Sequence, residues 1–147
     1  MSNKIVRGIN KNRSKQVVQK NNVNTDREKP LWSFENVDND GEYRFSTDSV
    51  NTKVVIDKIL SLSKMTWFEI KKATHDDGKS KNHELDYEGI SESGKNRIRA
   101  KKLTEEDIDA IFSLAFTNKI RVIGLKKERI FYVIWYDSEH GFYPVDK

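Results

Sequence analysis

Apolar residues recur every three or four positions in three stretches of the chain, which is the spacing of one face of a helix. The first stretch predicts a helix over residues 50–62, rich in valine, isoleucine and leucine. The second predicts a short helix from Trp67 to about Lys72, because Thr66 and Glu69 have the spacing of a capping box. The third predicts a helix over residues 104–118, whose first turn is acidic, as the helix dipole favours.

Other stretches have the patterns of strands. Ile120–Leu125 and Ile130–Tyr136 are apolar on both faces apart from Arg121, which is typical of strands at the centre of a sheet. The pair Asp40-Gly41, with alternating aromatic residues on both sides, predicts a β-hairpin over residues 31–46. Together the patterns predict an α+β fold: a small, mostly antiparallel sheet packed against two or three helices.

Two segments lack a regular pattern. Residues 1–29 are rich in Asn, Lys, Gln and Arg without a sustained period, and we expect them to form a disordered basic arm. Residues 74–102 are poor in apolar side chains and contain three glycines, so we expect a long irregular loop, a feature that is often functional. The predicted organisation is the arm followed by a single α+β domain over 30–147, with that loop inside it.

The positive charge of the chain is concentrated near its start. Residues 1–30 carry eight Lys or Arg and two acidic residues, whereas the remaining 117 residues carry nineteen basic and twenty-one acidic groups. The arm therefore acts either as a solubilising leader or as an electrostatic contact for nucleic acid or an acidic partner. The body lacks the excess of positive charge that a phosphate-binding cleft usually has.

Composition excludes several classes of site. The chain has no cysteine, which excludes disulfides, thiolate metal sites and cysteine nucleophiles. It has no apolar run of membrane-spanning length and no signal-peptide core, so we expect a cytoplasmic protein without a membrane partner. The three histidines lack the spacing of a metal-binding motif, and no metal or other cofactor is expected.

The stretch from Phe131 to Val145 ends an apolar strand in three evenly spaced polar side chains, those of Asp137, His140 and Tyr143. An imidazole can move protons near neutral pH, a carboxylate can fix its tautomer, and a phenol can donate to charge developing on a phosphate. Arg121, in the neighbouring predicted strand, would complete a phosphate clamp. Two interpretations stay open: a catalytic group, or a turn in which Asp137 binds the local backbone while Arg121 forms a salt bridge.

A cluster of cations precedes the third predicted helix. Five positive charges fall within eight residues, a density that suits contact with a phosphate backbone and also occurs in solvated linkers. The candidate nucleic-acid-binding residues are Lys95, Arg97, Arg99, Lys101 and Lys102.

The segment RVIGLKKERIFYVIWYDSEHGFYPV, residues 121–145, resembles the ending of a family of short bacterial and mobile-element proteins. In that family an Arg-x-x-Gly strand is followed by an aromatic strand, an Asp-x-x-His turn and Tyr-Pro. The upstream segments LWSFENVDNDGEYRFS and LSKMTWFEI fit the same layout, so the resemblance covers about two-thirds of the chain.

More distantly, helices followed by antiparallel strands with an arginine and a terminal His or Tyr are similar to the RelE/ParE superfamily of toxin proteins. That resemblance implies a ribosome-dependent mRNA endonuclease that needs no metal. It places Arg121, His140 and Tyr143 at the site, with Lys101 and Lys102 as phosphate contacts.

The leading hypothesis is therefore a bacterial RelE-like endoribonuclease of the toxin–antitoxin type, encoded by a mobile genetic element. Its partners would be RNA or the ribosome, and an antitoxin or other protein. In this hypothesis His140 moves protons, Asp137 orients it, and Arg121 and Tyr143 stabilise phosphate charge. One alternative is a non-catalytic module that binds nucleic acid or an acidic protein. Another is an inhibitor of a phage or host protein that uses the aromatic hairpin as its interface.

Overall fold

A computed structural model describes residues 24–46 and 50–146. In chain order the elements are β1 (Leu31–Ser33), α2 (Thr52–Leu62), α3 (Trp67–Lys72), β2 (His83–Glu84), η1 (Tyr87–Gly89), α4 (Glu92–Ala100), α5 (Glu105–Asp109), β3 (Ile111–Ala115), β4 (Arg121–Lys127), β5 (Ile130–Asp137) and η2 (Pro144–Asp146). In the described residues the strands form one five-stranded sheet of order β1-β5-β4-β3-β2. Strand β1 is parallel to β5, and the other pairings are antiparallel. The predicted α+β fold with a mostly antiparallel sheet is confirmed.

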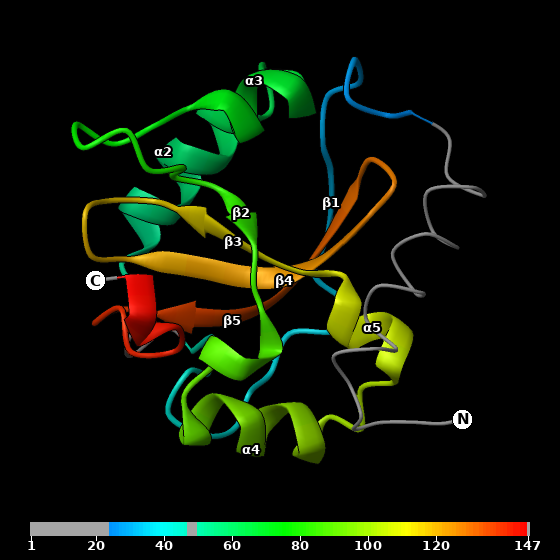
Figure 1. Cartoon of the computed structure of the whole chain (residues 1–147), viewed down its shortest axis with the longest axis vertical. Helices are drawn as coiled ribbons and strands as arrows, with labels where there is room; N and C mark the ends of the chain where they lie inside the picture. The colour runs from blue at the N-terminus through cyan, green and yellow to red at the C-terminus, as the bar shows by residue number, and fades with distance from the viewer. Residues whose placement is uncertain (1–23, 47–49, 147) are drawn as a thin grey trace.

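The sheet lies between two layers (Figure 1). Helices α2 and α3 cover one face, where Trp67 and Phe131 are fully buried. Helix α4 and the segment after β5 cover the other face, where Trp135 and Phe142 are fully buried. Burial of each such aromatic side chain contributes roughly 1.5–3 kcal/mol, so two apolar cores hold the sheet from opposite sides.

Helices α2 and α3 form as predicted, because their ends carry local signals. The side chain of Asn51 accepts the backbone N–H of Val54 at the start of α2. At the start of α3, the Thr66 N–H donates to Glu69 Oε1 (2.9 Å) and the Glu69 N–H donates to Thr66 Oγ1 (3.2 Å), which is a complete capping box.

The predicted helix over 104–118 is wrong. A capping box of Thr104 and Asp107 does start a helix, but α5 ends at Asp109 and the chain continues as β3. All five residues of β3 are buried, and they pair with β4 from Ile111↔Leu125 to Ala115↔Arg121. A helix there would bury one face only, whereas a strand between two layers buries both, so tertiary packing overrides the helical spacing.

The predicted hairpin over 31–46 is also wrong. Strand β1 pairs with β5 instead, and residues 43–46 form no strand. The reason is Asp38, which is 3% exposed and draws the intervening chain into the protein. Its carboxylate accepts the Trp135 Nε1–H (2.9 Å) and two hydrogen bonds from Arg97 (2.9 and 3.0 Å).

The segment 74–102 is not one irregular loop, because it contains β2, η1 and α4. Helix α4 begins where the Ser91 hydroxyl accepts the Gly94 N–H (3.1 Å), and Ile98 buries one face of it. A Cβ at Gly94 would lie 2.7 Å from Ile90 Cγ2, so this glycine allows the helix to approach the core closely.

The last six residues of the predicted arm over 1–29 have a defined structure. Residues 24–29 pack against α3, where the Phe68 N–H donates to the Asp26 carbonyl (2.8 Å) and the Trp67 N–H donates to the Glu28 carbonyl (2.9 Å). The rest of the predicted arm, residues 1–23, lies outside the described residues. Among the helices that the structure describes, none has the length and apolar character needed to cross a membrane.

Candidate functional site

The side chain of Asp137 stabilises the turn that follows the last strand. It is 2% exposed, its Oδ1 accepts the Gly141 N–H (3.0 Å), and its Oδ2 accepts the Phe142 N–H (2.8 Å). These bonds turn the chain after β5 and insert the Phe142 ring into the core beneath α4. The carboxylate therefore acts on the backbone of its own turn, as the structural interpretation of this segment predicts.

The other three candidate catalytic residues do not share an open surface with it. Arg121 is 6% exposed, and its Nη1 donates to the carbonyl oxygens of Thr117 (2.7 Å) and Ile120 (3.2 Å). His140 is 7% exposed and has a left-handed backbone with φ of 59°. Tyr143 lies over η1, where its hydroxyl accepts the Asp86 N–H (3.3 Å). This arrangement does not support the catalytic interpretation, because a substrate phosphate could not reach the buried guanidinium and imidazole.

The cations of residues 95–102 have different partners and surroundings. Arg97 is bound to Asp38, and Arg99 pairs with Glu92 (3.0 Å). The Lys95 ammonium lies 5.0 Å from the centre of the Tyr87 ring. Lys101 and Lys102 line a small pocket at the end of α4. The five cations therefore do not form one phosphate-binding surface.

The structure brings together a different set of side chains, in a hollow near the β4–β5 turn. A pocket of about 940 Å³ opens between β2, α5 and that turn. A second pocket of about 380 Å³ adjoins it, and the two share Lys127 and Tyr132. We call the two pockets together the groove. The lining of the larger pocket is apolar at Ala110, Phe112 and Ile130.

Each lysine of the larger pocket already has a partner. The Lys71 ammonium binds Asp26 (2.8 Å), and the Lys127 ammonium binds Asp107 (2.6 Å). The Lys126 ammonium donates to the Glu128 carbonyl (2.9 Å) and lies 4.9 Å from the centre of the Trp67 ring.

Burial and ion pairing shift pKa values along this lining. Burial lowers the pKa of Lys126, and the nearby charge of Lys71 lowers it further. Burial by itself raises the pKa of Asp107, but the hydrogen bond from Lys127 and those from Thr104 outweigh it and hold that pKa below the ordinary value. The Asp107 carboxyl group is therefore ionised at neutral pH.

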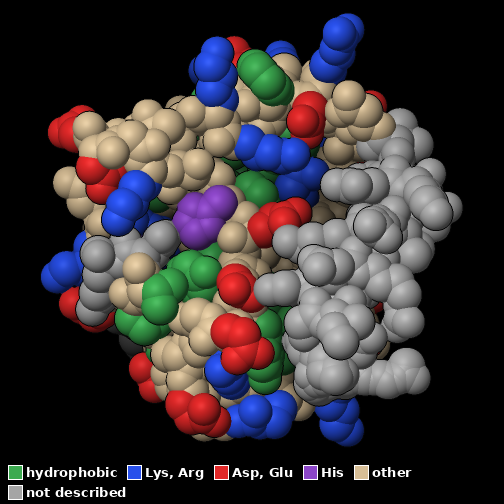
Figure 2. Space-filling view, viewed as in Figure 1, with side chains coloured by type: hydrophobic (Ala, Val, Ile, Leu, Met, Phe, Trp, Pro, Cys, Tyr) green, Lys and Arg blue, Asp and Glu red, His purple; other side chains and the backbone are tan. Residues whose placement is uncertain are grey.

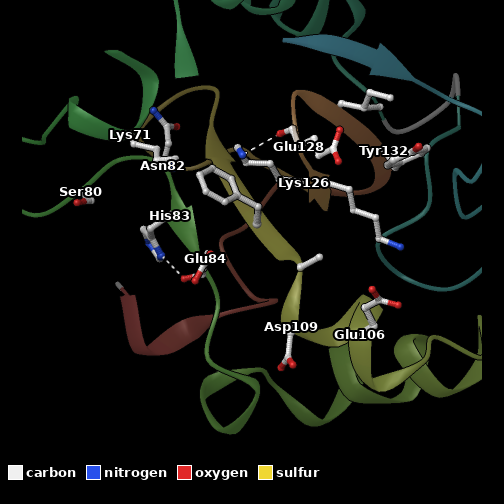
Figure 3. A pocket seen from close by; sticks show the side chains of 14 residues that line it. Lys71, Ser80, Asn82, His83, Glu84, Glu106, Asp109, Lys126, Glu128 and Tyr132 are labelled. Atoms are coloured by element: carbon white, nitrogen blue, oxygen red, sulfur yellow. Dashed lines mark hydrogen bonds between the residues drawn. The ribbon is translucent and has the colours of Figure 1, made fainter. Parts of the chain in front are cut away.

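Carboxylates surround the same pocket. Figure 3 shows Glu106 and Asp109 from α5, Glu84 from β2 and Glu128 from the β4–β5 turn on different sides of the opening. The side chains of Glu106 and Glu128 form no ion pair within the part of the chain that the structure describes. On the face seen in Figure 2, acidic and basic side chains are interspersed, without one large patch of either sign.

A histidine lies at the β2 side of the groove. The Nδ1 atom of His83 is 2.8 Å from the Glu84 carbonyl oxygen, and its ring centre is 6.0 Å from that of Tyr143. Across residues 24–46 and 50–146, no group of three or more His, Cys, Asp or Glu side chains is placed to hold a metal ion. The groove therefore offers charged groups of both signs, hydrogen-bonding groups and some apolar side chains in one lining.

Sequence reasoning did not find the groove. Its residues come from β2, α5 and the β4–β5 turn, which are distant in the chain and contain no motif. The closest signal was the density of charges in 105–109 and 126–129, which the sequence pattern presented as a helix start and a linking turn. Comparison of the chain with protein-family models, curated proteins and solved structures gives no match. The resemblance to the mobile-element family and to RelE/ParE toxins therefore stays a prediction.

Proposed function

We propose that this protein is a non-catalytic binding module of the cytoplasm, whose groove takes an extended segment of a partner polypeptide. The observation that carries the proposal is the lining of the groove. Charges of both signs line it together with the apolar or aromatic residues Ala110, Phe112, Ile130 and Tyr132. A polypeptide supplies side chains of both signs, backbone donors and acceptors, and apolar groups, so it can match such a surface.

A nucleic acid matches the groove less well. Its phosphates would face the four carboxylates of Glu84, Glu106, Asp109 and Glu128, and like charges at short range cost affinity. The lysines of the larger pocket could bind phosphate only after leaving the partners they already have. Binding to phosphates gains most where unpaired cations release counterions, and Lys101 and Lys102 in the smaller pocket are too few to dominate.

The RelE-like endoribonuclease is the competing proposal, and a single experiment separates the two. A phage-displayed library of random linear peptides is panned against the immobilised full chain. Enriched peptides are then synthesised with a fluorescent label, and their Kd is measured by anisotropy beside that of a labelled random-sequence single-stranded RNA.

Two variants locate the binding. Ala110→Trp fills the groove with bulk and leaves its charge unchanged. Glu139→Gln removes an exposed charge at the far end of β5 and is the matched control. We expect enriched peptides to bind the wild type and Glu139→Gln equally and to lose about tenfold or more in affinity on Ala110→Trp, which is about 1.4 kcal/mol.

The outcomes against the proposal are equally definite. It fails if enriched peptides bind Ala110→Trp as well as they bind the wild type. It also fails if the RNA binds more tightly than any peptide and Ala110→Trp abolishes the RNA binding. Cleavage of that RNA by the wild type, lost on His140→Ala, would establish the endoribonuclease instead.

A further inference from the structure

The described chain begins at the rim of the groove. The Asp26 carboxylate binds the Lys71 ammonium (2.8 Å), and Lys71 lines the larger pocket. Thr25 is buried, and the Asp26 carbonyl is fixed by the Phe68 N–H, so this part of the chain is anchored on α3. The first described residues therefore lie beside the opening of the larger pocket.

The charge of residues 1–23 is opposite to the charge that the larger pocket leaves unmatched. Residues 1–23 contain six Lys or Arg and no Asp or Glu. In the larger pocket the lysines are matched by a carboxylate or a carbonyl, whereas Glu106 and Glu128 form no ion pair within the described residues. The excess of the larger pocket is thus negative, and a cationic segment fits it.

The sequence of residues 1–23 also fits the apolar part of that lining. Val17 and Val18 lie between Lys15 and Lys20, so a short stretch carries apolar side chains flanked by cations. The lining of the larger pocket has complementary groups, carboxylates together with apolar side chains. An extended chain of this length reaches roughly 75 Å, so distance from the anchor at residue 24 sets no limit.

We infer that residues 1–23 occupy the groove of their own chain and compete there with the partner segment. The inference rests on the proposed function only for the identity of the competitor, since the contact within the chain needs no partner. Because a tethered segment acts at an effective concentration of about millimolar, even weak contacts are enough to fill the groove. A partner must then displace residues 1–23, which sets a threshold on its affinity.

Carbodiimide cross-linking of the full-length chain tests the contact directly, because it joins a lysine to a carboxylate only where the two meet. The products are digested and identified by mass spectrometry, using a mixture of ¹⁴N- and ¹⁵N-labelled protein to separate links within a chain from links between chains. We expect links within one chain from Lys11, Lys15 or Lys20 to Glu106 or Glu128. They should fall at least about fivefold in the double variant Glu106→Gln with Glu128→Gln.

Glu139→Gln is the matched control, because Glu139 lies far from the groove. It follows Asp137, and the rise of strand β5 places Asp137 roughly 23 Å from Ile130 in the pocket lining. This substitution should leave the cross-links to Glu106 and Glu128 unchanged. The inference is overturned if the lysines of residues 1–23 link mainly to carboxylates outside the groove, such as Glu139, or link only between chains.

Competition is measured with a peptide that the panning selects. Reversing three charges, in the triple variant Lys11→Glu, Lys15→Glu and Lys20→Glu, should tighten the binding of that peptide to the full chain about tenfold if residues 1–23 fill the groove about nine-tenths of the time. Unchanged affinity, together with cross-links outside the groove, overturns the inference and leaves the proposed function standing. If cross-links form inside the groove but panning selects no peptide, the inference stands and the proposed function fails. Failure of the inference and failure of the proposed function are therefore distinguishable.

Discussion

Substitution of the buried Asp38 tests whether its side-chain hydrogen bonds stabilise the fold. Its two oxygens accept hydrogen bonds from the Arg97 guanidinium, the Trp135 indole and the Asp40 backbone. These bonds connect the segment after β1 to α4 and to β5, which are 59 and 97 residues away in sequence. Asp38→Ala removes every one of these acceptors at once.

The expected cost follows from what Asp38→Ala leaves behind. The Trp135 side chain is fully buried, and its unsatisfied N–H costs about 1–3 kcal/mol. The Arg97 side chain is 22% exposed, so water recovers part of the charge that it leaves unpaired. We therefore place the loss at about 3 kcal/mol, the lower end of the range for breaking a buried ion pair. With a typical urea m-value of about 2 kcal/mol/M, the unfolding midpoint should fall by about 1.5 M.

Urea unfolding followed by tryptophan fluorescence measures this loss. Asp38→Asn keeps one acceptor for Trp135 and should lose about half as much. Asp57→Ala is the matched control: it breaks an exposed ion pair with Lys53 and should change stability by less than about 0.5 kcal/mol. If Asp38→Ala were no more destabilising than Asp57→Ala, the view that Asp38 anchors this segment would be refuted.

The pH dependence of stability gives an independent measure of the same ion pair. Burial by itself raises the pKa of Asp38, but hydrogen bonds from Arg97, Asp40 and Trp135 outweigh it and hold the pKa below the ordinary 3.8. A group with a depressed folded pKa contributes its full stability above the unfolded pKa and loses it as the pH falls through the folded pKa. The stability difference between wild type and Asp38→Asn should therefore be constant above about pH 5 and shrink in more acidic solution.

Three further substitutions test the turn, the sheet and the groove. Asp137→Ala leaves two backbone N–H groups of the final turn without their acceptor, and urea unfolding should show a loss of about 2–4 kcal/mol; a normal midpoint would contradict the structural role. Gly124→Ala places a Cβ against the Tyr132 carbonyl at the register shift between β4 and β5, and should cost about 3 kcal/mol or more by the same assay. Glu128→Gly relieves a left-handed backbone with φ of 55°, so stability should change by less than about 1 kcal/mol, while anisotropy should show weaker binding of a selected peptide that carries cations.

The elements that the sequence predicted well carry their own local signals. The capping box of Thr66 and Glu69 starts α3 where it was expected. The last two strands are apolar on both faces, and β4 and β5 begin and end within two residues of the predicted bounds. Asp137 at the end of β5 was open to two interpretations, and its bonds to the next turn favour the structural one.

The elements that the sequence did not predict depend on contacts between residues far apart in the chain. The residues of β3 satisfy a helical spacing and a buried-strand pattern equally well, and only the two packed layers decide between them. The aromatic segment around Asp40-Gly41 has the local features of a hairpin, but the bonds of Asp38 to α4 and β5 direct it elsewhere. The burial of Arg121 and His140 could not be foreseen either, because it depends on segments that only the fold brings over them.

Two residues of the groove show a conflict between local preference and position, and the left-handed backbone of His140 is a further case outside the groove. Glu128, at the mouth of the groove, has a left-handed backbone, where glycine or asparagine costs less. Lys126, inside the groove, is buried enough for its pKa to be lowered, although it lies near the end of a strand where water is within reach. Both residues hold a polar side chain in a position that costs stability. Sites where a sequence accepts such costs are those where binding is expected to matter more than folding. His140 shares the left-handed backbone but is 7% exposed, so we expect a partner to bind at the open groove and not at the Asp137–His140 turn.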